Sequence, residues 1–291
     1  MINDDQLPAP SLPIQRVPDA LDVGTLDAHK LDPSRFWLAH QGTLLGQSFQ
    51  IGFTIPSVGD AVRFAELLEA QRQAGLAYVH QVLHAPKDRV FILDWIVLSS
   101  QINEAPGPHA WSVGEITVEP REVAGDGRRT RRAVLAFTIH ARGAEIGHGS
   151  AKVRLVSQAV YQRLRFGAVR IVTQATEGQQ HISGSQETHC VKFSVDPGDP
   201  ILNDHASDHV TAMSVACALE RLVSSLPDSP RLTELALSFA SYAECDLSTE
   251  LRLRGPVGGS FSGELVQDGV TAAEFTGRCD SAPPKATNST N

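Results

Sequence analysis

The feature that most constrains the fold of this 291-residue chain is a helix followed by several strands, a pattern that occurs twice. In its first occurrence, residues 48–56 predict a strand. Residues 60–83 carry apolar residues at three-to-four spacing with charges between them, which predicts a long helix. Strand-like segments then fill residues 89–156, with a Gly-Asp-Gly hairpin signal at 125–127.

The second occurrence repeats this order. Residues 190–196 predict a strand, and residues 208–226 predict a helix that is apolar on most sides. Three strands are expected after it, at 231–243, 248–255 and 261–277. Because a helix that is apolar nearly all round has to be buried, we expect it to lie within a curved sheet. The fold class is α+β, since no regular βαβ alternation occurs, and the two units indicate an internal pseudo-dimer.

These patterns divide the chain into four segments. Residues 1–27 are rich in proline and aspartate and predict a flexible N-terminal arm. Residues 28–166 form the first repeat and residues 167–279 the second. Residues 280–291 have no large apolar residue, which predicts a disordered tail.

Composition argues against several classes of function. A formal net charge of −8 disfavours nucleic acid as the main partner. The one basic run, residues 128–132, is typical of a solvated hairpin loop, with docking of an acidic carrier protein as the alternative. No apolar run reaches the roughly 18–20 residues of a membrane span. Cys190, Cys217, Cys245 and Cys279 form no paired motif and follow no secretory signal, which predicts reduced thiols and a cytoplasmic protein.

A polar cluster precedes the second helix. Asp204, His205, Asp208 and His209 form two Asp–His pairs four residues apart, a spacing that can stack like residues on one helical face. The cluster could supply metal ligands or acid–base groups, or Asp208 could cap the helix by accepting backbone N–H groups. Because no second ligand cluster accompanies it, we expect no metal and no other cofactor.

A charge pair marks the first helix. Glu69 and Arg72 lie three residues apart and would form an ordinary salt bridge on an exposed helix. On a buried helix, burial is expected to raise the pKa of Glu69 towards the range of a general base. Arg72 could then hold a phosphate or a developing oxyanion. His80 and His84, at the end of this helix, fit a structural role because a helix C-terminus favours histidine.

Four segments resemble the A-factor (γ-butyrolactone) synthase family: LLEAQRQAGLAYVH (67–80) followed by Ala85-Pro86, HKLDPSRFWLAH (29–40), VYQRLR (160–165) and NDHASDHVTAM (203–213). The resemblance covers residues 28–278 and implies two fused hotdog repeats, each a long central helix wrapped by an antiparallel sheet. It also implies an acyltransferase that condenses a β-ketoacyl group, carried as a thioester on acyl carrier protein or coenzyme A, with dihydroxyacetone phosphate. The product would be a butenolide precursor of a γ-butyrolactone-like signalling molecule.

The resemblance also implies site residues. Glu69, Arg72 and Gln73 match the family's Glu-x-x-Arg-Gln motif, and His80 falls where the family often has histidine. Glu69 and Arg72 would be catalytic, and Gln73 and His80 would bind substrate. In the second repeat the positions that match Glu69 and Arg72 hold Cys217 and Glu220. This repeat therefore lacks the pair.

This asymmetry allows a single composite site, because the charge pair lies in one repeat and the Asp–His cluster in the other; alternatively, His209 and Asp208 only cap the second helix. We expect His209 to join the charge pair in catalysis, and the rest of the cluster to contact substrate: Asp204, His205 and Asp208.

Two other functions stay open. One is a hotdog dehydratase or thioesterase that acts on carrier-bound acyl chains. The other is a non-catalytic acyl-binding or regulatory protein that kept the fold and lost half of its site, which the altered Cys217 and Glu220 would favour. In each case we expect no nucleic-acid or membrane partner, and either a monomeric pseudo-dimer or a homodimer.

Overall fold

The computed structural model describes residues 19–55, 62–101, 112–166, 188–193, 209–257 and 259–280. Within these ranges one 12-stranded sheet has the order β1-β2-β3-β5-β6-β7-β4-β9-β12-β11-β10-β8, and every neighbouring pair is antiparallel. The strands are β1 (Asp19–Asp22), β2 (Leu38–Leu45), β3 (Ser48–Thr54), β4 (Val90–Ser100), β5 (Val113–Ala124), β6 (Arg132–Ala141), β7 (Ala144–Val156), β8 (Thr188–Phe193), β9 (Arg231–Phe239), β10 (Thr249–Val257), β11 (Ser260–Gln267) and β12 (Val270–Asp280). The α-helices are α1 (Phe64–Gln81), α2 (Gln158–Phe166) and α3 (Ala212–Ser224).

The two halves of the sheet have matching strand orders. They meet where β4 pairs with β9, with Leu98 opposite Leu235. Outward from β4 the order is β7-β6-β5-β3, and outward from β9 it is β12-β11-β10-β8. In each half the strand before the long helix is therefore far from the centre, and the strand after the helix lies at the centre. β1 and β2 extend the first half only.

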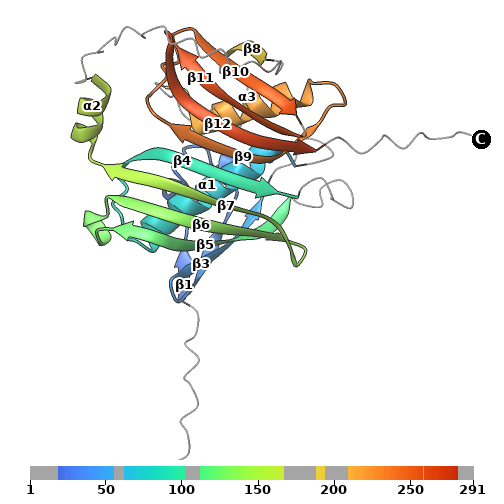
Figure 1. Cartoon of the computed structure of the whole chain (residues 1–291). Helices are drawn as coiled ribbons and strands as arrows, with labels where there is room; N and C mark the ends of the chain where they lie inside the picture. Colours follow the sequence, from blue (N-terminus) through green and yellow to red (C-terminus); the bar gives the residue numbers. More distant parts are fainter. Residues whose placement is uncertain are drawn as a thin grey trace, which may run out of the picture.

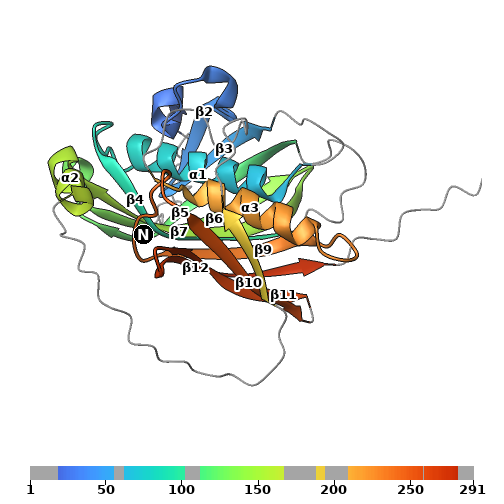
Figure 2. The same cartoon turned by 90° about the horizontal axis from the view of Figure 1, so that it is seen from above.

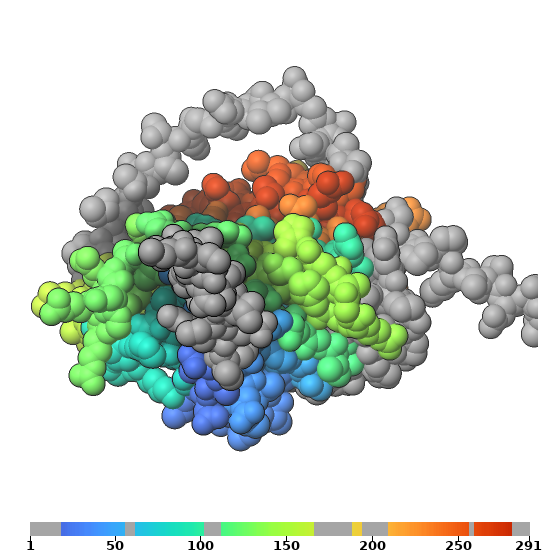
Figure 3. Space-filling model, turned by 90° about the horizontal axis from the view of Figure 1, so that it is seen from below, coloured from blue at the N-terminus to red at the C-terminus, as the bar shows by residue number. Residues whose placement is uncertain are grey.

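The helices α1 and α3 lie on the same face of this sheet (Figures 1 and 2). Seen from below, most of the surface belongs to the first half of the chain, and the second half, in orange and red, lies along one edge (Figure 3). Nearly every residue of α1 is buried, including the polar residues Glu69, Gln71 and Gln73. The predicted burial of this helix is thus confirmed, and the charge of Glu69 lies inside the core.

One predicted strand is wrong. Residues 261–277 were expected to form a single strand, but β11 and β12 are two strands joined at Asp268 and Gly269. Both turn residues have positive φ, 51° and 76°, which glycine adopts freely and aspartate tolerates. The Asp-Gly pair is a hairpin signal that periodicity alone overlooked.

The predicted N-terminal arm of residues 1–27 is also wrong over its last part. Asp19–Asp22 pair with β2, Val23 is buried in the core, and Thr25–Ala28 form the short 3-10 helix η1. Apolar side chains at Leu21 and Val23 hold this stretch against the protein. Residues 1–18 and the predicted tail from 281 lie outside the described residues.

Candidate active site

The candidate site is a cavity of about 860 Å³ to which both halves contribute. Lys30, Glu69 and Arg72 line it from the first half, and His209 and Tyr242 line it from the second. The predicted catalytic residues Glu69, Arg72 and His209 are therefore brought together in one cavity. The walls are otherwise largely apolar, and include Leu76, Phe91, Leu93, Met213 and Phe239.

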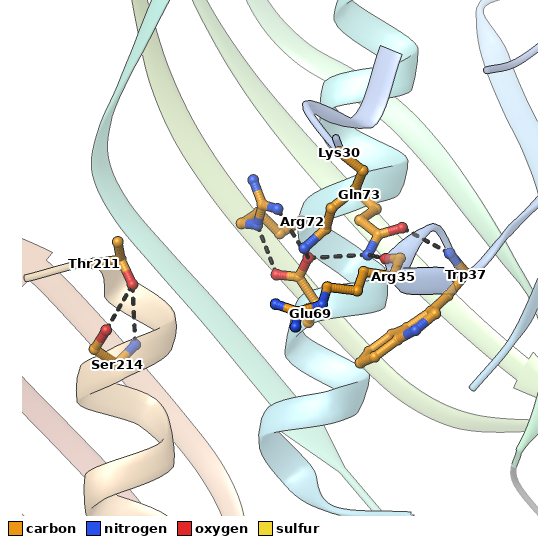
Figure 4. Close-up of polar contacts among 8 residues, drawn as sticks. All are labelled: Lys30, Arg35, Trp37, Glu69, Arg72, Gln73, Thr211 and Ser214. Atoms are coloured by element: carbon orange, nitrogen blue, oxygen red, sulfur yellow. Dashed lines mark hydrogen bonds and ion pairs between the residues drawn. The ribbon is translucent and has the colours of Figure 1, made fainter. Parts of the chain in front are cut away.

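Glu69 is held by three side chains (Figure 4). Arg72 donates two hydrogen bonds to its carboxylate, from Nε at 2.7 Å and from Nη2 at 2.8 Å. Lys30 Nζ lies 3.0 Å from Glu69 Oε1, and Gln73 Nε2 donates to the same oxygen at 3.0 Å. The Lys30 and Glu69 side chains are 3% and 1% exposed, so both charges of this ion pair are removed from water and balance each other at close range.

The expected pKa of Glu69 is wrong in direction. Burial raises the pKa of this carboxyl, but the charges and hydrogen bonds of Arg72, followed by the charge of Lys30, outweigh burial and lower the pKa to about 2. A carboxylate this acidic is a weak proton acceptor at neutral pH. Glu69 is therefore suited to fixing the positions of Arg72 and Lys30. It is poorly suited to act as the general base that its burial suggested.

Gln73 ties this charge cluster to the segment that precedes β2. Besides Glu69, its Nε2 donates to the carbonyl of Arg35 at 3.0 Å, and its Oε1 accepts from the backbone N–H of Trp37 at 3.0 Å (Figure 4). It is fully buried and does not line the cavity. Gln73 therefore positions Glu69, and its predicted contact with substrate stays a prediction.

His80 lies on the same face of α1 as Arg72 and Leu76, but it does not line the cavity. Its Nδ1 is 2.9 Å from the carbonyl of Ala85, and its Nε2 is 2.9 Å from Nε2 of His29. Burial lowers the pKa of His80, which favours the neutral ring. His29 itself does line the cavity.

Two residues of this site had no role assigned from the sequence, namely His29 and Lys30. Both belong to HKLDPSRFWLAH, so the family resemblance had marked the segment. No local pattern marks the two residues, because their partners His80 and Glu69 lie about 40–50 positions away in the chain.

On the opposite wall, the cavity meets the start of α3. Thr211 is the N-cap, and its hydroxyl accepts from the backbone N–H of Ser214 at 3.1 Å (Figure 4). The helix thus begins at Ala212 with Thr211 as its N-cap, which rules out the alternative in which Asp208 is the N-cap. His209 packs edge-on against Tyr242, with ring centroids 5.0 Å apart. Asp204, His205 and Asp208 lie outside the described residues.

The second half uses the matching helix position differently. Arg72 is the ninth residue of α1, and Glu220 is the ninth residue of α3. The carboxylate of Glu220 accepts from the backbone N–H groups of Phe64 at 2.6 Å and Ala65 at 3.4 Å, the first two residues of α1. Glu220 therefore caps the neighbouring helix. Cys217, which matches Glu69, is buried in the core.

The described residues hold no group of three His, Cys, Asp or Glu side chains that could bind a metal ion. No helix among them is long and apolar enough to cross a membrane.

Comparison with known proteins gives a fold, and a match to one family model over part of the chain. Residues 53–157 match the family model of the A-factor biosynthesis hotdog domain, which confirms the predicted resemblance. No curated protein matches the chain.

Among solved structures, the 12:0-ACP thioesterase from Umbellularia californica is 14% identical, with 81% of this chain and 98% of that chain covered and a TM-score of 0.56. An acyl-ACP thioesterase from Bacteroides thetaiotaomicron is 9% identical, with coverage of 80% and 98% and a TM-score of 0.49. At this identity the first likeness shows a shared fold and no more. The chain has a hotdog fold.

Proposed function

We propose, because residues 53–157 match the family model of the A-factor biosynthesis hotdog domain, that this protein is an acyltransferase of the A-factor synthase type. It would join a β-ketoacyl group, carried as a thioester on acyl carrier protein or coenzyme A, to a hydroxyl of dihydroxyacetone phosphate. We further propose that the matching strand orders reflect two fused hotdog repeats with one composite site between them. The protein would work in the cytoplasm.

The observation that carries this proposal is the surplus of positive charge at the cavity. Among the described residues that line it, five side chains are cationic and two are anionic: Lys30, Arg72, Lys87, Arg89 and Arg154 against Glu69 and Asp88. Across the cavity lies the start of α3, where the helix dipole and the first N–H groups favour an anion. The matching helix start, that of α1, already holds an anion, the carboxylate of Glu220. A substrate phosphate at Arg72 would place an anion near the start of α3, as Glu220 places its carboxylate at the start of α1.

The rest of the cavity suits an acyl thioester. Apolar walls of Leu76, Phe91 and Phe239 would hold the acyl chain, and about 860 Å³ lies within the range of small-molecule sites. Of the other lining cations, Lys87 is paired with Asp27 and Arg154 with Asp94, and Arg89 could attract the phosphate groups of an acidic carrier or of coenzyme A. We assign His209, on the opposite wall, to hydrogen bonding with the substrate.

In this proposal Arg72 binds the substrate and Glu69 holds the cations in position. Arg72 would hold the phosphate and bring the hydroxyl beside the thioester carbon. Glu69 would keep Arg72 and Lys30 in place at neutral pH, where its low pKa keeps it ionised.

A direct assay tests the proposal. The purified chain would be incubated with β-ketoacyl carrier protein and dihydroxyacetone phosphate, and the ester would be measured by mass spectrometry. The Glu69→Gln variant should lower ester formation by about 10²-fold, because one charge that fixes Arg72 is lost. Glu66→Gln, on the same helix but bonded to Arg63, should stay close to wild type.

Other products would redirect the assignment. Unchanged ester formation in Glu69→Gln would show that the site lies elsewhere. Free acid in place of ester would identify a thioesterase, the alternative that the fold shared with the 12:0-ACP thioesterase favours. A dehydrated product would identify a dehydratase, and tight acyl binding without turnover would identify a binding protein.

A further inference from the structure

A general base is required for attack by a hydroxyl, and Glu69 does not fit that role. Three side chains already donate to its carboxylate, and Oε1 alone receives Lys30, Arg72 and Gln73. A substrate hydroxyl would have to displace one of these donors. The base is therefore to be sought among the other side chains that line the cavity.

His29 is the candidate with a defined protonation pattern. A backbone carbonyl can only accept, so His80 Nδ1, 2.9 Å from the carbonyl of Ala85, carries a hydrogen. The neutral His80 ring then has its lone pair on Nε2. Because His29 Nε2 lies 2.9 Å from that atom, His29 donates from Nε2, and the neutral form of its ring carries the lone pair on Nδ1.

The contacts from the Ala85 carbonyl through His80 to His29 orient the His29 ring, as a catalytic histidine that accepts a proton has to be oriented. His80 is buried and fixed on α1, and the edge of Phe91 packs against the His29 ring, with centroids 4.8 Å apart. When His29 takes a proton, the new imidazolium keeps its Nε2–H bond to His80. The neighbouring ring thus orients the base and stabilises its charged form.

The position of His29 also fits the substrate. Arg72, Leu76 and His80 share one face of α1, and Arg72 and His80 are two turns apart, about 12 Å along the helix axis. His29 and Arg72 both line the cavity, with Leu76 also in its wall. A phosphate ester bound at Arg72 would therefore share the cavity with His29.

We propose that His29 is the general base of the acyl transfer and that His80 is its positioning residue, an assignment that rests on the proposed function. His29 Nδ1 takes the hydroxyl proton as the oxygen attacks the thioester carbonyl carbon. A carbon–oxygen bond forms, the carbon–sulfur bond breaks, and the imidazolium returns the proton to the leaving thiolate. The products are the ester and the free thiol of the carrier.

Glycine variants test this with a matched control. His29 and His84 have nearly the same left-handed backbone, with φ of 54° and 53°, which glycine adopts without strain. His84 is exposed and does not line the cavity. We expect His29→Gly to slow ester formation by about 10²- to 10⁴-fold and added imidazole to restore part of the rate. His84→Gly should remain within about twofold of wild type.

The outcomes separate the two proposals. If wild type forms no ester, the proposed function fails and the role of His29 falls with it. If wild type forms ester and His29→Gly is equally active, or is slow and not rescued by imidazole, only the role of His29 is overturned. Loss in a His209 variant with full activity in His29→Gly would place the base on the other wall.

A second measurement needs no turnover. Nitrogen-15 NMR of the imidazole rings should show His80 protonated on Nδ1 and His29 protonated on Nε2 in the resting protein. The His29 signal should change in His80→Phe. Finding both rings in the same tautomer would overturn the proposed relay even if the ester is formed.

Discussion

Arg72 is the ninth residue of α1 and Glu220 is the ninth residue of α3, and the two side chains have different roles. Glu220 places a carboxylate on the first N–H groups of α1, so that helix start is closed by the protein itself. Arg72 lines a cavity that also reaches the start of α3. Equivalent places in two similar halves therefore carry charges of opposite sign. One place is an internal cap, and the other lines the cavity.

Glu69 and the partly buried Glu220 show what decides the pKa of a carboxyl group inside this fold. Burial raises the pKa of Glu220, and its bonds to the N–H groups of α1 do not cancel this effect. Burial acts in the same direction on Glu69, but Arg72 and Lys30 reverse it and lower the pKa to about 2. The cations around a buried carboxylate, more than its depth, decide whether it is a base or a fixed anion.

The largest predicted effect on stability is the loss of the Glu69 carboxylate. Glu69→Ala would leave Lys30 buried without its anion, and we expect a loss of about 3–5 kcal/mol in the free energy of unfolding. Urea denaturation would measure this. A loss below 1 kcal/mol would show that the ion pair is not needed to hold the two segments together.

Acid should remove nearly as much stability. The Glu69 pKa is about 2 in the folded chain against an ordinary 4.5, so the unfolded chain binds the proton more readily. This stability is fully present above pH 4.5 and is lost as the pH falls towards 2, about 3 kcal/mol in all. Glu69→Gln should remove that part of the pH dependence. An unchanged acid limb in this variant would contradict the assignment.

A smaller effect is expected in the other half. Glu220→Ala would leave two N–H groups at the start of α1 without their acceptor, which should cost about 1–2 kcal/mol. Glu220→Gln keeps an acceptor oxygen and should lose less. Thermal unfolding of the two variants would check this order, and ester formation should stay near wild type in both. A fall in activity would show that the capped half also takes part in catalysis.

Much of the fold could be predicted from the sequence because its elements are local. The three-to-four spacing in α1, the apolar surface of α3 and the alternation in most strands follow from neighbouring residues. The hairpin at Asp268 and Gly269 was also visible, as an Asp-Gly pair inside one long run, and was missed because periodicity was followed through it.

The site was only partly predictable, because its decisive contacts are distant in sequence. Glu69 and Arg72 could be recognised as a pair three residues apart. Lys30, which helps to reverse the pKa shift of Glu69, comes from a segment whose position depends on the whole fold. The role of Glu220 likewise depends on how the two helices meet, since the start of α1 is 155 positions away from it. Local patterns carry no information on either contact.

Binding of dihydroxyacetone phosphate, measured by calorimetry, tests the contrast between the halves most directly. The account predicts one site per chain, weakened by at least about 10-fold in Arg72→Ala, since a charge-assisted bond to phosphate is lost. Glu220→Gln should bind as wild type does. Two equal sites per chain, or unchanged binding in Arg72→Ala, would contradict it.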